Sequence, residues 1–85
     1  MADLDSHVEA LADELSRRGF IVTITRNAHY PSLTVDHPEV GRLSETIYVA
    51  LARDEPWFWW SWAERIAPAA DVQATADAVA HVLRT

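Results

Sequence analysis

One run of aromatic residues constrains the fold of this chain more than any other part of its sequence. Residues 57–62 read Trp-Phe-Trp-Trp-Ser-Trp. Aromatic side chains favour strands, and successive residues of a strand point to opposite faces of its sheet. The run therefore predicts a strand that carries large aromatic side chains on both faces.

The pattern of apolar residues places one helix before this run and another after it. The first helix carries apolar side chains at helical spacing, namely Leu4, Val8, Leu11 and Leu15. We expect it to end at Gly19, because glycine readily adopts the left-handed conformation that follows many helices. The last helix begins after Asp71, a suitable N-cap, and its expected inward face consists of Val72, Ala76, Val79, Val82 and Leu83.

Four strands are expected between the two helices. Their predicted ranges, taken from alternating β-branched and aromatic residues, are 20–25, 32–36, 45–52 and 57–63. Residues 26–31 and the polar residues 53–56 are predicted as turns, and the second turn makes the last two strands a hairpin. The segment 64–70, closed by Pro68, is expected to be irregular.

These elements predict an α+β fold in the order α-β-β-β-β-α, with one domain spanning residues 1–85. Short connections favour an antiparallel meander of four strands, because parallel neighbours would require longer crossovers. Both helices carry an apolar stripe, so we expect both to pack on one face of the sheet. The sheet residues expected beneath them are Phe20, Val22, Ile24, Leu33, Val35, Ile47, Val49 and Leu51.

Alternation divides the aromatic strand between the two faces of this sheet. The residues assigned to the core are Phe58, Trp60 and Trp62. The opposite face receives Tyr48, Trp57 and Trp59, with Thr23, Thr25 and Thr34 around them. Three fully exposed aromatic side chains would present on the order of 500 Å² of largely apolar surface, near the largest patch that a typical monomer tolerates. Such patches tend to be functional, so the candidate binding residues are Tyr48, Trp57 and Trp59.

Several kinds of cover for this aromatic face are open at the level of sequence. The chain itself would cover the face if residues 37–44, or the residues after Trp62, fold over it. A second copy would cover it in a homodimer, and a different protein, a peptide or a small ligand would cover it in a complex. The expected function is non-enzymatic protein–protein interaction or a regulatory accessory role, with self-association through the aromatic face. A small-ligand or carbohydrate-binding module is the alternative.

Charge and composition argue against several classes of partner. The chain has a formal net charge of −6 at pH 7, which opposes binding to phosphate backbones, so no nucleic-acid partner is expected. No apolar run approaches the roughly 18 residues of a membrane span, and the acidic N-terminus lacks the cationic start of a signal peptide. We therefore expect no membrane partner. The absence of cysteine agrees with a cytoplasmic location.

The sequence offers no pattern of catalytic or metal-binding residues. The four histidines share neither a helical i, i+4 spacing nor a strand alternation that would converge them on a metal; they are His7, His29, His37 and His81. Glu64, beside the tryptophans, would suit glycosidic chemistry only with a second carboxylate nearby, and the spacing singles out none. The chain lacks a catalytic cysteine, a Ser-His-Asp motif and a phosphate loop. We expect no enzyme activity, no cofactor and no metal.

Two segments carry a resemblance to other proteins. Residues 44–49 read Ser-Glu-Thr-Ile-Tyr-Val, and the Trp-Phe-Trp-Trp run at 57–60 is followed by Ala-Glu-Arg-Ile at 63–66. With these motifs the chain resembles small uncharacterised α-β4-α proteins of actinobacteria with high-GC genomes, over most of its length. The resemblance implies a bacterial cytoplasmic setting and no particular activity.

Overall fold

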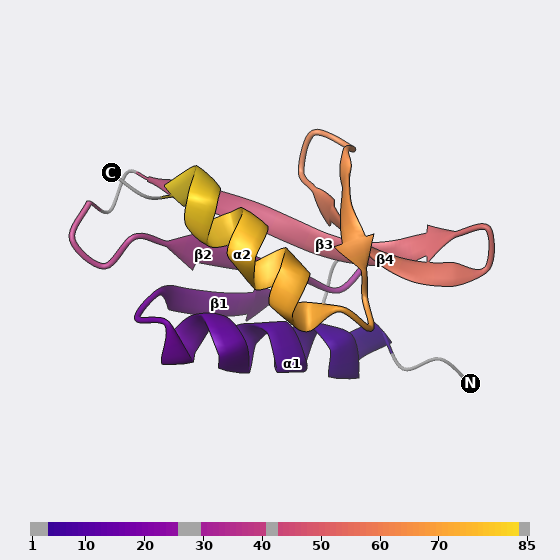
Figure 1. Ribbon diagram of the computed structural model, residues 1–85, viewed down its shortest axis with the longest axis horizontal. Helices are drawn as coiled ribbons and strands as arrows, with labels where there is room; N and C mark the ends of the chain where they lie inside the picture. The colour runs from indigo at the N-terminus through magenta and orange to yellow at the C-terminus, as the bar shows by residue number, and fades with distance from the viewer. Residues whose placement is uncertain (1–3, 26–29, 41–42, 84–85) are drawn as a thin grey trace.

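The computed structural model describes residues 4–25, 30–40 and 43–83 of the chain (Figure 1). Its elements are α1 (Leu4–Arg17), β1 (Ile21–Thr25), β2 (Ser32–Asp36), β3 (Ser44–Ala52), β4 (Glu55–Trp60), β5 (Arg65–Pro68) and α2 (Val72–Leu83). The strands form an antiparallel sheet in the order β1-β2-β3-β4-β5. The predicted α+β meander is confirmed, but the prediction of four strands is wrong because β5 adds a fifth. Residues 26–29 of the first predicted turn lie outside the described residues.

The end of α1 agrees with the prediction from sequence. Gly19 has a positive φ of 96°, and its N–H donates to the Ser16 carbonyl at 3.0 Å. The N–H of Phe20 donates to the Leu15 carbonyl at 3.1 Å. This pair of bonds is a Schellman motif, which satisfies carbonyls that the helix end would otherwise leave without partners. The chain therefore turns directly from α1 into β1.

The start of α2 is fixed by the predicted N-cap. The N–H of Ala74 donates to Oδ1 of Asp71 at 3.1 Å, as an N-cap requires. The buried hydroxyl of Thr75 donates to the Asp71 carbonyl, also at 3.1 Å. Val82, which we expected to face inward, is 45% exposed. The other predicted residues do face the core: Ala76, Val79 and Leu83 are buried and Val72 is partly buried. Thr75, which was not predicted, is buried with them.

Both helices pack on the same face of the sheet. Their buried residues form a hydrophobic core with the sheet residues Leu33, Val35, Ile47, Val49, Phe58 and Trp60. Figure 1 shows α2 crossing in front of the sheet. The predicted core residues Phe20, Val22 and Ile24 are partly buried against it. Leu51, also predicted there, is 53% exposed, because it lies near the tip of the β3–β4 hairpin, which extends past the helices.

The predicted hairpin of β3 and β4 is confirmed. Ala52 pairs with Glu55, which leaves Arg53 and Asp54 as a two-residue turn with positive φ values of 52° and 70°. Positive φ at both central residues defines a type I′ turn, whose twist matches that of the flanking strands. The turn therefore fixes the register that places the aromatic residues of β4 on their faces.

The fifth strand follows a turn whose usual sequence signal is absent. The N–H of Ala63 donates to the Trp60 carbonyl at 3.0 Å, and the N–H of Trp60 donates to the Glu64 carbonyl at 2.8 Å. Ala63 has a φ of 68°. These features define a three-residue hairpin loop with its third residue in the left-handed region, where glycine is the usual residue. Alanine occupies that position here. The prediction that residues 64–70 are irregular is wrong for β5, which pairs with β4.

The prediction that Trp62 lies in the core is wrong. β4 ends at Trp60, so strand alternation does not continue to Trp62, which is 53% exposed in the turn. Its ring stacks on that of Trp60, with centroids 5.0 Å apart and an angle of 7° between the planes. Its Nε1 donates to Oε1 of Glu64 at 3.2 Å. Trp62 therefore lies outside the core and covers the ring of Trp60 from solvent. Trp60 is only 6% exposed.

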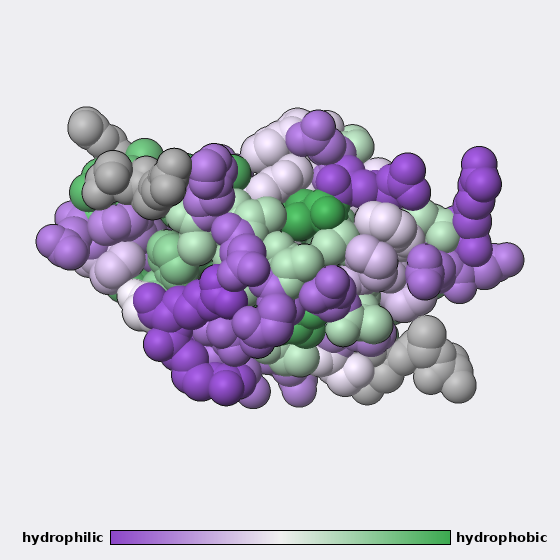
Figure 2. Space-filling model, viewed as in Figure 1, coloured by the Kyte–Doolittle hydropathy of each residue, from purple (hydrophilic) through white to green (hydrophobic). Residues whose placement is uncertain are grey.

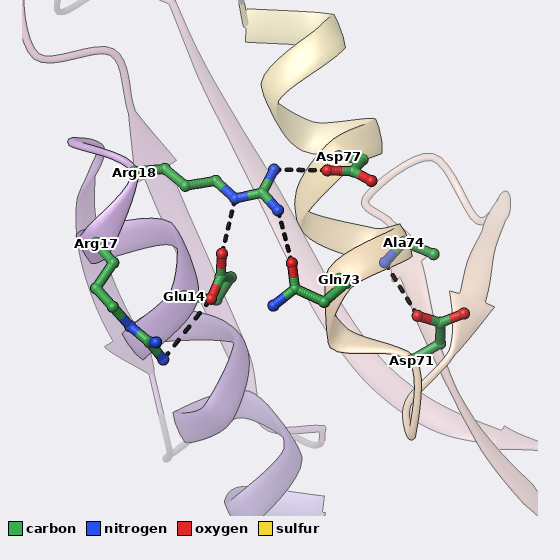
Figure 3. Close-up of polar contacts among 7 residues, drawn as sticks. All are labelled: Glu14, Arg17, Arg18, Asp71, Gln73, Ala74 and Asp77. Carbon is green, nitrogen blue, oxygen red and sulfur yellow. Dashed lines mark hydrogen bonds and ion pairs between the residues drawn. The ribbon is translucent and has the colours of Figure 1, made fainter.

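A cluster of polar side chains joins the two helices (Figure 3). Arg18 donates from Nε to Oε2 of Glu14 at 2.9 Å and from Nη1 to Oδ1 of Asp77 at 2.7 Å. Its Nη2 donates to Oε1 of Gln73 at 2.9 Å. We call these four residues the Arg18 clamp. It links α1 to α2 at the C-terminal end of α1, where hydrophilic residues gather on the surface (Figure 2).

The Arg18 clamp also changes the acid–base properties of its members. The hydrogen bond from Arg18 lowers the pKa of the Glu14 carboxyl below its ordinary value of 4.5, and Gln73 and Arg17 lower it further. Glu14 and Asp77 raise the pKa of the Arg18 guanidinium in return. A carboxyl whose pKa is lower in the folded state favours folding above its unfolded pKa. This contribution is lost as the pH falls from about 4.5 through the folded-state pKa of Glu14.

Replacing Ala63 by glycine should stabilise the protein. A left-handed conformation costs a residue with a side chain about 1–2 kcal/mol, and glycine avoids this cost. Part of the stabilisation is lost because glycine has more conformational freedom in the unfolded chain. We expect Ala63→Gly to raise the free energy of unfolding in urea by about 0.5–1 kcal/mol. Ala70→Gly, at an exposed position without a positive φ, is the control and should give no stabilisation. Equal effects of the two changes would contradict the assignment of the turn.

Replacing Glu14 by glutamine should weaken the dependence of stability on pH. The wild-type protein gains stability from Glu14 above pH 4.5 and loses it in more acidic solution. We expect thermal denaturation of Glu14→Gln to show a smaller drop in Tm between pH 6 and pH 3 than the wild type shows. Asp13→Asn, an exposed carboxylate on the same helix, should retain the wild-type drop. An unchanged pH profile in Glu14→Gln would contradict this role of the Arg18 clamp.

Candidate functional site

The face of the sheet opposite the helices, here called the open face, holds the three predicted binding residues. Tyr48 pairs directly with Trp59, and Ala50 pairs with Trp57, across β3 and β4. Residues that pair directly in an antiparallel sheet point to the same face. The next pairs along, Val49 with Phe58 and Ile47 with Trp60, join buried residues and so point to the helices. The structure therefore brings Tyr48, Trp57 and Trp59 together on one face.

Three aromatic rings stack across the open face and form what we call the aromatic row. The Tyr48 and Trp59 centroids lie 6.1 Å apart, with 6° between the ring planes. The Tyr30 and Tyr48 centroids lie 5.9 Å apart, with 27° between the planes. Tyr30 precedes β2 and Trp59 belongs to β4, so the two rings flank Tyr48 from opposite sides. The aromatic row thus runs from the residues before β2, across β3, to β4.

Hydrogen bonds hold the tryptophans of the open face close to the sheet. Nε1 of Trp59 donates to the Ala50 carbonyl at 3.2 Å, and Nε1 of Trp57 donates to Oε1 of Glu55 at 3.1 Å. The guanidinium of Arg65 lies over the Trp57 ring, 4.8 Å from its centroid, within the range of a cation–π contact. Ala50, between the tryptophans, is only 7% exposed. The aromatic side chains therefore bury part of their own surface.

This packing reduces the apolar area that the open face presents. Tyr48, Trp57 and Trp59 are half-buried, not fully exposed as the estimate from sequence assumed. Tyr30, at the end of the aromatic row, is 44% exposed. The face is therefore a partly packed aromatic surface rather than three isolated projecting rings.

The other half of the open face is rich in hydroxyl groups. Its residues, placed there by pairing across β1, β2 and β3, are Thr23, Thr25, Ser32, Thr34 and Thr46. The hydroxyls of Thr34 and Thr46 are 3.3 Å apart, which is hydrogen-bonding distance. The charged residues that pairing places on the face are few: Asp36, Glu55 and Arg65. The open face is thus much less acidic than the chain as a whole, whose formal charge is −6.

Neither of the two segments considered as cover for the aromatic residues folds over them in its described part. In the segment 37–44, Leu43 packs against the helix-side core, and residues 41–42 lie outside the described residues. After Trp62 the chain forms β5 at the sheet edge and then α2 on the helix face. Within the described ranges, the open face is therefore left without a covering helix, strand or loop.

The described residues hold no group of three His, Cys, Asp or Glu side chains close enough to bind a metal ion. Nδ1 of His37 accepts hydrogen bonds from the N–H groups of Glu39 and Val40, at 3.0 and 3.1 Å. His7 lies on α1 and His81 on α2, while His29 lies outside the described residues. The lowered pKa of Glu14 and the raised pKa of Arg18 arise in the Arg18 clamp, on the helix side of the molecule.

Tyr30 and Arg65 belong to the site but were not predicted from the sequence. Tyr30 would have required the register that pairs Ser32 with Tyr48, because this register places Tyr30, two residues before Ser32, beside the ring of Tyr48. Arg65 would have required β5, whose turn lacks the glycine that signals such a loop. In both cases the missing information was the pairing of strands.

Comparison of the chain with models of protein families, with curated proteins and with solved structures finds no match. Along the described ranges, no helix combines the length and the apolar character needed to cross a membrane. The site must therefore be interpreted from its own geometry.

The stacked rings of the aromatic row should stabilise one another. Aromatic pairs contribute about 0.5–1.5 kcal/mol beyond the area that they bury. A double-mutant cycle with Tyr48→Ala and Trp59→Ala, followed by urea denaturation, should give a coupling energy in this range. The control cycle pairs Tyr48→Ala with Trp62→Ala, on the other side of the sheet, and should give a coupling below about 0.5 kcal/mol. Equal coupling in the two cycles would contradict the stacking.

Proposed function

We propose that the protein is a non-enzymatic interaction domain that associates with a second copy of itself through its open face. The observation that carries this proposal is the aromatic row on a sheet face that the described residues leave uncovered. Tyrosine and tryptophan are enriched where proteins bind each other, because they bury a large area and keep a polar group for hydrogen bonding. The row and Trp57 are the expected centre of the contact.

The distribution of charge supports a second copy as the partner. Two molecules with a formal charge of −6 repel each other at most orientations. The open face carries two carboxylates, Asp36 and Glu55, and one guanidinium, Arg65. Repulsion is therefore weak where two open faces meet, and Arg65 of each copy can offset a carboxylate of the other.

The dimensions of the open face support a weak contact. Five strands about 4.8 Å apart make the sheet roughly 24 Å wide, and most of the strands, at four to six residues, are roughly 13–20 Å long. The resulting area of roughly 300–500 Å² is below the roughly 800 Å² per partner of a standard interface. We therefore propose reversible association at micromolar or higher concentration. A regulatory accessory role in the cytoplasm, as the sequence suggests, is consistent with such a contact.

The alternative function, binding of a small ligand or carbohydrate, receives less support from the geometry. Sugars stack on the free faces of aromatic rings, and in the aromatic row Tyr48 is flanked by Tyr30 and Trp59. Trp57 already holds the Arg65 guanidinium over its ring. A ligand would have to displace these contacts, whereas a protein surface can cover the outer edges of the rings without doing so.

Sedimentation equilibrium on three proteins tests the proposed function. We expect wild-type protein to associate reversibly, and Trp59→Ala to raise the dissociation constant at least about tenfold, since a buried tryptophan is a common interface hot spot. Trp62→Ala removes an exposed tryptophan from outside the open face and should leave the constant unchanged. Circular dichroism would verify that each variant is folded. A wild-type monomer at all concentrations, or equal effects of the two changes, would contradict the proposal.

A further inference from the structure

The hydrogen bonds between strands determine which backbone groups of β1 point away from the sheet. The N–H of Val49 donates to the Pro31 carbonyl, and the N–H of His37 donates to the Leu43 carbonyl. Odd-numbered residues of β2 therefore bond to β3. Because residues of an antiparallel strand alternate between their two neighbours, the even-numbered residues Ser32, Thr34 and Asp36 bond to β1.

The register then identifies the free groups on β1. Asp36 pairs with Ile21, Thr34 with Thr23 and Ser32 with Thr25, so the N–H and C=O groups of these β1 residues face β2. The intervening residues Val22 and Ile24 direct their N–H and C=O groups outward. β1 is an edge strand with β2 as its neighbour, and no hydrogen bond satisfies these outward groups within the described residues. β1 thus presents two donors and two acceptors in alternation.

The opposite edge strand, β5, has features that prevent it from pairing with another strand, and β1 lacks them. The N–H of Ala69 donates to the Pro56 carbonyl of β4 at 2.9 Å, so Pro68, the residue before it, lies at a position whose backbone groups point outward. Proline has no N–H, and the Pro68 carbonyl accepts a hydrogen bond from Asp71 at 2.8 Å. β5 also contains a bulge. Proline and bulges are devices that prevent an edge from pairing; β1, with the sequence Ile-Val-Thr-Ile-Thr, contains neither of them and no charge.

We propose that β1 is a second self-association site, where β1 of another copy pairs antiparallel and extends the sheet. The twofold axis passes between the two Thr23 residues, so that Val22 of each copy exchanges backbone hydrogen bonds with Ile24 of the other. This register uses all four outward groups of each strand. It goes beyond the proposed function, because it involves the edge of the sheet and not the open face.

The side chains of β1 suit this twofold arrangement. Val22 and Ile24 lie on the helix face, half-buried against the core, and in the paired strands each covers the exposed part of the other. Thr23 lies on the open face, where the two hydroxyls face each other across the axis and can exchange a hydrogen bond. Ile21, which is 54% exposed, is placed opposite Thr25. The contacts of Val22 with Ile24 and of Thr23 with Thr23 therefore join side chains of matching polarity. The remaining contact joins Ile21 to the small side chain of Thr25.

The edge can be tested by removing one outward N–H without disturbing the bonds between β1 and β2. Proline is tolerated in an edge strand where its missing N–H would face solvent, which is the position of Val22. We expect Val22→Pro to weaken the association measured by sedimentation equilibrium at least about tenfold. Val22→Ala, which loses side-chain packing but keeps the N–H, is the matched control and should associate more tightly than Val22→Pro.

Hydrogen exchange on the wild-type protein tests the same site if Val22→Pro fails to fold. The amides of Val22 and Ile24 should exchange quickly in dilute solution and about tenfold or more slowly in concentrated solution, as pairing protects them. The amide of Thr23, bonded to β2, should not show this gain. Exchange at Val22 and Ile24 that is independent of concentration would overturn the proposal. A different outcome would separate the two proposals: Trp59→Ala abolishes association, and Val22→Pro and Val22→Ala associate equally tightly. That result would contradict the edge site at β1 and support association through the open face.

Discussion

The burial of Phe58 and Trp60 beneath the two helices is the interaction on which the rest of this structure depends. Phe58 is fully buried and Trp60 is 6% exposed, and burying one such side chain stabilises a protein by about 1.5–3 kcal/mol. Total stabilities of small domains are only about 5–15 kcal/mol. Once these two residues face the helices, strand alternation forces Trp57 and Trp59 to the other face. The aromatic open face is thus a geometric consequence of the core.

The aromatic side chains of the open face, which the core does not bury, pack against one another and against the sheet. Tyr48 is stacked between Tyr30 and Trp59, and the indole N–H of Trp59 bonds to the backbone of β3. These contacts order the rings before any partner arrives, so little side-chain entropy remains to be lost on binding. The same contacts stabilise the sheet. A surface of this kind can serve folding and association at once, which is the basis of the function that we propose.

The two edges of the sheet differ in a way that follows from their surroundings. β5 leads through Pro68 into the N-cap of α2, and the Asp71 N–H that bonds to Pro68 also belongs to that connection. β1 emerges from the Schellman motif of α1 with β-branched residues throughout. Pro68 removes a hydrogen-bond donor from the β5 edge just before α2 begins, whereas β1 contains no proline. The Arg18 clamp holds the two helices together above this sheet.

Local signals in the sequence determined the helix ends at Gly19 and Asp71, strands β1 to β4, the inward direction of Phe58 and Trp60, and the grouping of Tyr48, Trp57 and Trp59. Each of these depends on residue spacing or on the conformation of one residue. The other features depended on the pairing of strands. They are the formation of β5 after a turn at Ala63 that lacks the usual glycine, the exposure of Trp62, and the presence of Tyr30 and Arg65 in the site. Registers and crossings between distant segments set which side chains meet, and no spacing along a single segment contains that information.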